Sequence, residues 1–185
     1  MRVIAGRVKG HHLRAPTGMD TRPTSDKVRE AIFDILADEF AGEPVLDLFA
    51  GTGALGIEAL SRGASEAIFV ERRRQACQVI KANLRHTGLE SQARLLCMSV
   101  ERALDDLDLP CGLVLLDPPY AYANMHPIME AVGEARVVVE QTMVVLEHSP
   151  RFEPAHKYGC LDVRRQRVYG DTAVSIYIAQ EEQNR

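Results

Sequence analysis

The sequence predicts an α/β domain built on a mostly parallel β-sheet. Its 185 residues, 46% of them hydrophobic, are enough for one globular domain with a sizeable core. From residue 45 onward, short apolar runs alternate with longer segments of helical periodicity, which is typical of βαβ units. The first apolar run ends in a glycine-rich turn, a common feature of parallel sheets that bind nucleotides. These three observations indicate the fold class.

The first 29 residues are rich in positive charge. They contain seven basic and two acidic side chains, whereas the whole sequence has a formal charge of -4. Residues 1–22 are therefore predicted to form a basic N-terminal extension, with a short β-hairpin around Lys9-Gly10, ahead of a second unit at 23–185. Such an extension suits nucleic-acid phosphates, and the candidate RNA contacts are Arg2, Arg7, Lys9 and Arg22. A solvated leader with incidental charge is the alternative.

One helix is predicted after the extension. Following Arg22-Pro23, either Thr24 or Ser25 can cap its N-terminus. Its apolar positions follow helical spacing: Val28, Ala31, Ile32, Ile35 and Leu36. The helix is expected to end before Gly42 and Pro44, which disfavour its continuation.

The alternation that follows predicts the order of strands and helices. Strands are expected at residues 45–49, 67–70, 93–97, 113–116 and 143–147. The helices between them are expected at residues 54–62, 74–86, 100–107 and 126–134. The tail differs, because residues 161–169 and 173–179 flank Gly170-Asp171 and are typical of an antiparallel hairpin. The prediction is thus a seven-stranded, mostly parallel sheet that ends in an antiparallel hairpin.

The cysteines and the hydropathy pattern argue against several classes of protein. Four cysteines, at 77, 97, 111 and 160, are far apart and form no Cys-x-x-Cys pair, so we expect core thiols, with neither a zinc site nor a disulfide framework. No metal is expected. The sequence has no run of 18 apolar residues and no signal-peptide pattern at its start, which predicts a cytoplasmic protein without a membrane partner.

The first predicted strand leads into a candidate nucleoside-binding turn. It reads Asp47-Leu48-Phe49-Ala50-Gly51-Thr52-Gly53-Ala54-Leu55-Gly56, and glycines at this spacing let the backbone approach a ligand closely. Glu71 ends the second strand, 20 residues after Gly51, where a carboxylate can accept hydrogen bonds from ribose hydroxyls. The candidate cofactor-binding residues of this turn are Asp47, Phe49, Gly51, Gly53, Gly56 and Glu71.

Two kinds of cofactor fit the glycine turn, since a nicotinamide dinucleotide and S-adenosylmethionine both present an adenosine ribose. Asp47 lies just before the glycines, where its carboxylate would repel a pyrophosphate but attract the ammonium group of a methionine. This favours S-adenosylmethionine. A loop-capping role for Asp47, and a helix-start charge for Glu71, are the structural alternatives.

A second motif, Asp117-Pro118-Pro119-Tyr120, directly follows the apolar run at 113–116 and should lie at the same edge of the sheet as the glycine turn. An exocyclic base amine is a poor nucleophile, because its lone pair is delocalised into the ring. Asp117 and the carbonyl of Pro118 can accept hydrogen bonds from such an amine as it becomes positive, on a turn that the prolines stiffen. Tyr120 can stack on a base swung out of its strand. Asp117, Pro118 and Tyr120 are therefore the candidate catalytic residues.

With these motifs, the sequence resembles the bacterial 16S ribosomal RNA guanine-N2 methyltransferase family, a class I, Rossmann-like family that uses S-adenosylmethionine. The resemblance covers nearly the whole chain. Apart from the two motifs above, it rests on Arg2-Val3-Ile4-Ala5-Gly6, Lys9-Gly10, Arg22-Pro23-Thr24, Asp26, Val28-Arg29-Glu30, Phe33 and Glu58-Ala59-Leu60-Ser61-Arg62.

The resemblance implies a product, N2-methylguanosine in small-subunit rRNA, and a basic N-terminal hairpin that helps to hold RNA. Relatives often carry Asp or Asn after the third strand to bind adenine, whereas this chain has Met98-Ser99-Val100, so Ser99 is the candidate adenine contact. Three alternatives stay open: an adenine-N6 methyltransferase, a nicotinamide-dependent dehydrogenase, and an RNA-binding assembly factor without activity.

Overall fold

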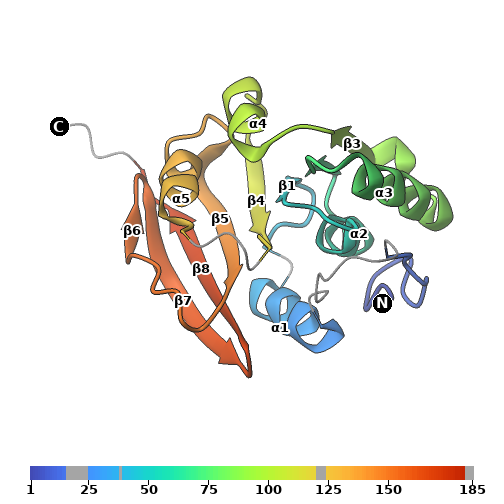
Figure 1. The fold of residues 1–185 in the computed structure, drawn as a ribbon, viewed down its shortest axis with the longest axis horizontal. Helices are drawn as coiled ribbons and strands as arrows, with labels where there is room; N and C mark the ends of the chain where they lie inside the picture. The colour runs from blue at the N-terminus through green and yellow to red at the C-terminus, as the bar shows by residue number, and fades with distance from the viewer. Residues whose placement is uncertain (16–24, 38, 120–123, 182–185) are drawn as a thin grey trace.

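A computed structural model describes residues 1–15, 25–37, 39–119 and 124–181. Its centre is one eight-stranded sheet with helices on both faces, as Figure 1 shows. The strand order is β3-β2-β1-β4-β5-β8-β7-β6. The predicted α/β fold class is confirmed, with a sheet one strand wider than expected.

Five parallel strands form the first part of the sheet: β1 Pro44–Leu48, β2 Glu66–Val70, β3 Ala93–Leu96, β4 Cys111–Leu116 and β5 Val138–His148. Their side chains are mostly apolar and buried, as expected for parallel strands covered on both faces. The register aligns Leu48 with Val70 on one side and with Leu116 on the other. Leu116 in turn aligns with Leu146, so the strands end at one common edge.

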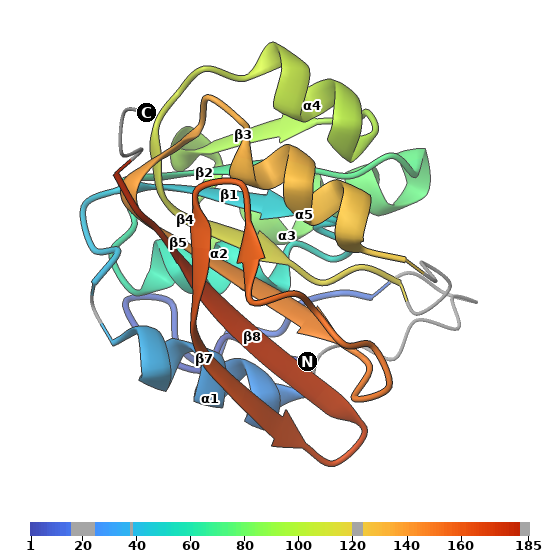
Figure 2. The ribbon, with the colours of Figure 1, turned by 90° about the vertical axis from the view of Figure 1, so that its left-hand side faces the viewer.

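The remaining strands extend the sheet beyond β5, and each runs antiparallel to its neighbour (Figure 2). β8 Thr172–Ala179 is antiparallel to β5, and β7 Leu161–Tyr169 is antiparallel to β8, which confirms the C-terminal hairpin. The eighth strand, β6 Lys157–Tyr158, was not predicted. This strand has two residues, which pair with Asp162 and Leu161. It is too short to show the alternation of polar and apolar residues from which a strand can be predicted.

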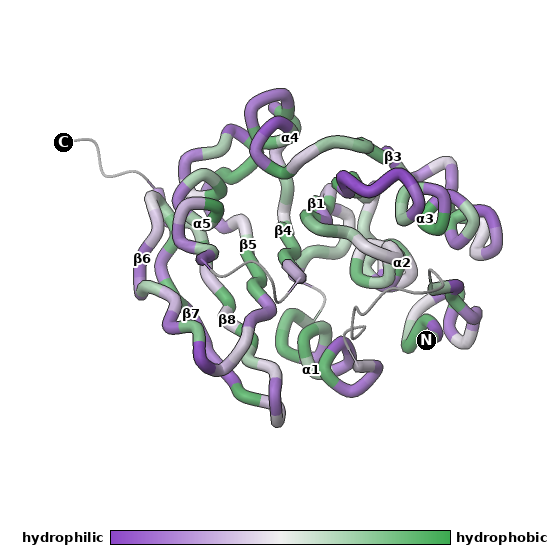
Figure 3. Tube along the Cα trace, in the orientation of Figure 1, coloured by the Kyte–Doolittle hydropathy of each residue, from purple (hydrophilic) through white to green (hydrophobic). Residues whose placement is uncertain are grey.

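Helices cover the two faces of the sheet in separate groups. α1 Asp26–Leu36, α2 Ala54–Ser61 and α3 Arg74–Thr87 pack on one face, followed by a short 3-10 turn at Glu90–Gln92. α4 Val100–Asp106 and α5 His126–Gly133 pack on the other face. Figure 3 shows hydrophobic residues concentrated along β1, β4 and β5, between these layers. Each face therefore has its own hydrophobic core.

Helix α1 begins where the sequence indicated. Ser25 is its N-cap and accepts a hydrogen bond from the Val28 amide through its hydroxyl, at 3.2 Å. Arg29, however, does not contribute to an exposed basic surface, because its side chain is fully buried. It forms ion pairs with Asp26 at 3.0 Å and with Glu58 of α2 at 3.8 Å. One of the seven basic residues at the N-terminus is thus part of the core.

Over its described residues, 1–15, the N-terminal segment reverses on itself but forms no regular strands. A single antiparallel bridge joins Arg2 and His12. The Glu58 carboxylate accepts hydrogen bonds from the amides of Ile4 and Ala5, at 2.8 and 3.0 Å. The amide of Arg7 donates to the carbonyl of Ser61 at 2.8 Å. The segment also pairs with itself, since the amide of Val3 donates to the carbonyl of His11 at 3.0 Å and the amide of Leu13 donates to the carbonyl of Met1 at 3.1 Å. It therefore closes on itself and is joined to α2.

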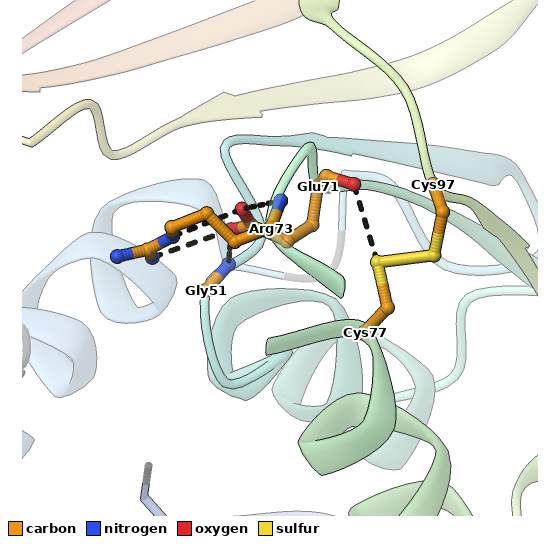
Figure 4. The surroundings of a disulfide bond; sticks show 5 residues. All are labelled: Gly51, Glu71, Arg73, Cys77 and Cys97. Atoms are coloured by element: carbon orange, nitrogen blue, oxygen red, sulfur yellow. Dashed lines mark hydrogen bonds and ion pairs between the residues drawn. A yellow bond between two sulfur atoms is a disulfide. The ribbon is translucent and has the colours of Figure 1, made fainter. Parts of the chain in front are cut away.

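The expectation of four core thiols is wrong for two of the cysteines. Cys77, in the first turn of α3, is joined to Cys97, just after β3, by a disulfide (Figure 4). The residues are 20 positions apart in sequence, and the crossover from β2 through α3 to β3 returns the chain to the same edge. Cys111 and Cys160 are free thiols.

Candidate functional site

Four acidic residues lie in a row along the carboxyl edge of the parallel sheet. Glu71 follows β2, Asp47 lies near the end of β1, Asp117 follows β4, and Glu147 is the penultimate residue of β5. These strands are consecutive neighbours in the sheet. Ligands of open α/β sheets bind at this edge, so the row marks the candidate site. The sequence pointed to the first three acids but not to Glu147.

The glycine turn between β1 and α2 is held by Asp47. Its carboxylate accepts a hydrogen bond from the Gly56 amide at 2.9 Å, which is the loop-capping contact foreseen as an alternative. A side chain at Gly56 would collide with the Phe69 ring, since a Cβ there would lie 2.4 Å from it. Gly53 has a φ of 79°, in the left-handed region that glycine adopts without strain.

Phe49 stands out in the same turn because its φ is 62°. A bulky residue rarely takes a positive φ, and such outliers concentrate at ligand-binding turns. Its side chain is half-buried and packs against the core on the α4 and α5 face. The strained backbone positions the glycines that follow.

Glu71 is bound to the turn and to its own neighbours (Figure 4). Its carboxylate accepts hydrogen bonds from the amide of Gly51 at 3.0 Å and from the amide of Arg73 at 2.8 Å. The guanidinium of Arg73 also pairs with it, at 3.1 Å. Glu71 is only 5% exposed. It therefore joins the end of β2 to the glycine turn, at the place expected for a ribose acceptor.

Asp47 has an unusual protonation equilibrium. Burial raises the pKa of its carboxyl to about 8, the Gly56 amide opposes this rise, and the charges of Asp117 and Glu71 add to it. Burial in a low-dielectric site disfavours the charged form of a carboxyl group. The electrostatic influence of Asp117 also indicates that the two predicted motifs share one site. A cation bound nearby would restore the ionised form.

Ser99 lies at the same edge, after β3. It is the N-cap of α4, and its hydroxyl accepts a hydrogen bond from the Arg102 amide at 3.4 Å. The side chain is exposed, and a hydroxyl can still donate a hydrogen bond. Cys97, which forms the disulfide with Cys77, lies two residues before Ser99.

A cleft of about 520 Å³ opens beside Asp117, within the usual size range of ligand pockets. Asp117, Pro118 and Pro119 form one side of it. The rest is lined by the start of α5 and the end of β5 with the loop that follows: Met125, His126, Glu147, His148, Ser149, Arg151, Phe152 and Glu153. Tyr120, the predicted stacking residue, lies outside the described residues.

Aromatic rings form a wall of this cleft that the sequence did not reveal. The ring of Phe152 lies 4.9 Å from that of His126 and 5.6 Å from that of His148, between centroids. His148 is held by the Ser149 carbonyl and the Ser175 hydroxyl, and burial lowers its pKa. Because these rings come from α5, β5 and a loop, no local pattern could connect them.

The candidate RNA contacts have different surroundings. Arg2 is exposed and lies 4.0 Å from the carboxylate of Asp26, while Arg7 donates to the side chain of Gln92. Lys9 is exposed. Arg22 lies outside the described residues. Three of the four predicted cations are thus on the surface of the segment that packs against α2.

Within the described part of the chain, no helix is long and apolar enough to cross a membrane. The same residues contain no group of three or more His, Cys, Asp or Glu side chains arranged to hold a metal ion.

The fold recurs in a known class of enzyme. A solved structure described as "Putative methyltransferase yhhF from Escherichia coli" matches this fold with a TM-score of 0.87. It is 29% identical and covers 98% of this chain and 99% of its own. The chain is therefore a Rossmann-like methyltransferase of the class that depends on S-adenosylmethionine.

Sequence comparison gives the family. The model of the family described as "Conserved hypothetical protein 95" matches residues 1–178, and the chain belongs to this family. The "Putative rRNA methyltransferase YlbH" of Bacillus subtilis is 41% identical, over 96% of this chain and 98% of its own. The "Ribosomal RNA small subunit methyltransferase D" of Escherichia coli is 29% identical, over 96% of this chain and 89% of its own.

Proposed function

We propose that this methyltransferase transfers a methyl group to the exocyclic N2 amine of a guanine in 16S ribosomal RNA, in the cytoplasm. The observation that carries the proposal is that Asp117 and Pro118 line the cleft, while the charge of Asp117 acts on Asp47 in the glycine turn. Family relatives named as rRNA methyltransferases support the substrate.

The residues at the glycine turn fit S-adenosylmethionine. Its ammonium and sulfonium groups are cationic, and Asp47 and Glu71 are acids that are almost fully buried. Burial disfavours the charged form of Asp47, and a cationic ligand beside it offsets that cost. We assign Asp47 to the ammonium group, Glu71 to the ribose hydroxyls and Ser99 to the adenine. Phe49, Gly51, Gly53 and Gly56 shape the turn that receives the ligand.

The chain's own residues then act on the base. The bound donor supplies an electrophilic methyl group on a sulfonium centre. Asp117 and the Pro118 carbonyl accept hydrogen bonds from the two N2 hydrogens, which favours the pyramidal, increasingly positive nitrogen of the transition state. As the C–N bond forms and the methyl group leaves sulfur, the nitrogen loses one of these protons, which the Asp117 carboxylate can accept. The cleft holds the base in one orientation, so positioning lowers the barrier further. Tyr120 is assigned to stacking on the base.

A transfer assay tests this function. The purified protein is incubated with methyl-labelled donor and either small ribosomal subunits or free 16S rRNA, both from a strain that lacks the activity. We expect label in 16S rRNA from at least one of the two substrates. Label only in DNA or protein, or none at all, would contradict the proposal.

We predict that donor binding releases a proton near pH 7. The raised pKa of Asp47, about 8, leaves its carboxyl mostly protonated in the free protein at that pH. A neighbouring ammonium favours the carboxylate, so affinity should rise as the pH approaches 8 and level off above it. Calorimetry in buffers of different ionisation enthalpy measures the protons released. Equal enthalpies in all buffers would refute the assignment, and Asp47→Asn should abolish the buffer dependence.

We also predict that the N-terminal cations grip RNA. Replacing Arg2, Arg7 and Lys9 together with glutamine should raise the KM for RNA and lower the salt slope of binding by about 2 to 3, near one per phosphate contact. Donor affinity should stay constant. The matched control replaces three exposed cations near the opposite face of the sheet, Arg102, Arg136 and Lys157. If both triple variants change the KM and the salt slope equally, or if neither variant changes them, the N-terminal cations do not bind RNA specifically.

A further inference from the structure

We propose that Glu147 selects guanine, by accepting a hydrogen bond from the N1–H of the target base. This inference rests on the proposed function, since it names the residue that decides which base that site accepts. Glu147 belongs to neither sequence motif. It enters through the structure alone, as a carboxylate that lines the cleft beside Asp117.

The register of the sheet places the two acids side by side. Leu116 of β4 aligns with Leu146 of β5 in a parallel pair, so the residues that follow them, Asp117 and Glu147, are neighbours across the same pair of strands. Adjacent strands are about 4.8 Å apart. Side chains alternate between faces along a strand, and both acids therefore leave the sheet on one face. The cleft thus presents two acceptors at the spacing of neighbouring strands.

Glu147 is unusually buried for a glutamate. Only 7% of it is exposed, and it follows four buried residues of β5, Met143 to Leu146. Its position at the end of the strand, in a cleft rather than in the core, suits contact with a ligand.

Two neighbouring acceptors match the edge of guanine that carries the reacting amine. On guanine, the N2 amine lies next to N1–H, so two donors face the protein together. On adenine, the reacting N6 amine lies next to an N1 that has a lone pair and no hydrogen. A carboxylate facing that lone pair would be repelled, and a buried polar group left without its hydrogen bond is costly. The pair of Asp117 and Glu147 therefore favours guanine over adenine.

The rest of the cleft suits a flat, uncharged base. The imidazole of His148 donates through Nδ1 to the Ser149 carbonyl, at 2.9 Å, and its Nε2 accepts from the Ser175 hydroxyl, at 2.8 Å. Burial lowers the pKa of His148, which keeps the ring neutral. With Phe152 it offers apolar ring surface to the same cleft, and stacking on such rings tolerates any base. Discrimination between guanine and adenine therefore depends on Asp117 and Glu147.

A base analogue tests the inference. After the target guanine is mapped, 16S rRNA is prepared with guanine or 2-aminopurine at that position, by ligation, in whichever form the wild-type protein methylates. The analogue keeps the N2 amine but has no hydrogen on N1. Single-turnover rates are measured for wild type, Glu147→Gln and Glu147→Asp. Glu140→Gln serves as control, because Glu140 is exposed on the same strand.

We expect Glu147→Gln to lower the rate ratio of guanine to 2-aminopurine by about 10- to 100-fold, the scale of a lost hydrogen bond to a charged group. Its amide can also donate to the bare N1 of the analogue. Glu147→Asp should keep the preference, and Glu140→Gln should match wild type. An unchanged ratio in Glu147→Gln would overturn the inference even if wild type makes N2-methylguanosine. If wild type makes another nucleoside, the proposed function itself fails.

Discussion

Replacing Asp117 by alanine is expected to slow methyl transfer by about 100-fold or more, on the scale of about 3 kcal/mol for a lost electrostatic stabiliser. The amine that Asp117 faces becomes positive only as the methyl group transfers, so the interaction is strongest in the transition state. Both kcat and kcat/KM should fall together, while donor affinity stays unchanged. Single-turnover rates on the RNA substrate measure the effect.

The asparagine variant separates charge from hydrogen bonding. Asp117→Asn keeps one acceptor oxygen but loses the negative charge, so its rate should fall between wild type and Asp117→Ala. Calorimetry with the donor is the control for an intact cofactor turn. A near-normal chemical step in Asp117→Ala would reduce the Asp-Pro-Pro-Tyr motif to a structural turn.

The second large effect is on stability. Glu58→Ala is expected to lower the free energy of unfolding by about 3 to 5 kcal/mol, because it leaves a buried charge without one of its partners. Glu58 pairs with Arg29 and with Arg62, whose Nε lies 2.8 Å from it. It also accepts from the amides of Ile4 and Ala5. Urea unfolding measures the loss, and hydrogen exchange at these two amides should become faster.

A surface ion pair provides the matched control. Glu39 pairs with Arg164 at 2.9 Å, and both side chains are 46% exposed. Such pairs contribute about 0 to 1 kcal/mol, so Glu39→Ala should unfold nearly as wild type does. If Glu58→Ala unfolds at the same urea concentration as Glu39→Ala, the buried pair does not anchor the N-terminal segment.

Much of the fold was predictable because each parallel strand carries its own signal. The apolar runs of β1, β2 and β4 and the glycines that follow β1 are local features, and the structure places them as expected. Ser25 was also a local signal, since capping depends on residues three positions apart. Strand β5 was predicted too short, because its first residues, including Val139, are exposed.

The missed features depend on contacts between distant segments. Cys77 and Cys97 meet only after a complete crossover, and Arg29 becomes a core residue only because α2 places Glu58 beside it. Glu147 had a usable signal, since an acid directly after an apolar run is the pattern that identified Asp117. That Glu147 lies next to Asp117 becomes apparent only from the register between β4 and β5.

The identity of the methylated nucleoside distinguishes a guanine-N2 methyltransferase from an adenine-N6 methyltransferase. RNA labelled in the transfer assay is digested to nucleosides, which are separated and identified by mass spectrometry against standards. We expect N2-methylguanosine as the labelled product, formed at least about 100-fold more slowly when Asp117→Ala replaces the wild-type protein. Label in N6-methyladenosine would contradict it, and with it the pairing of Asp117 and Glu147 that favours guanine.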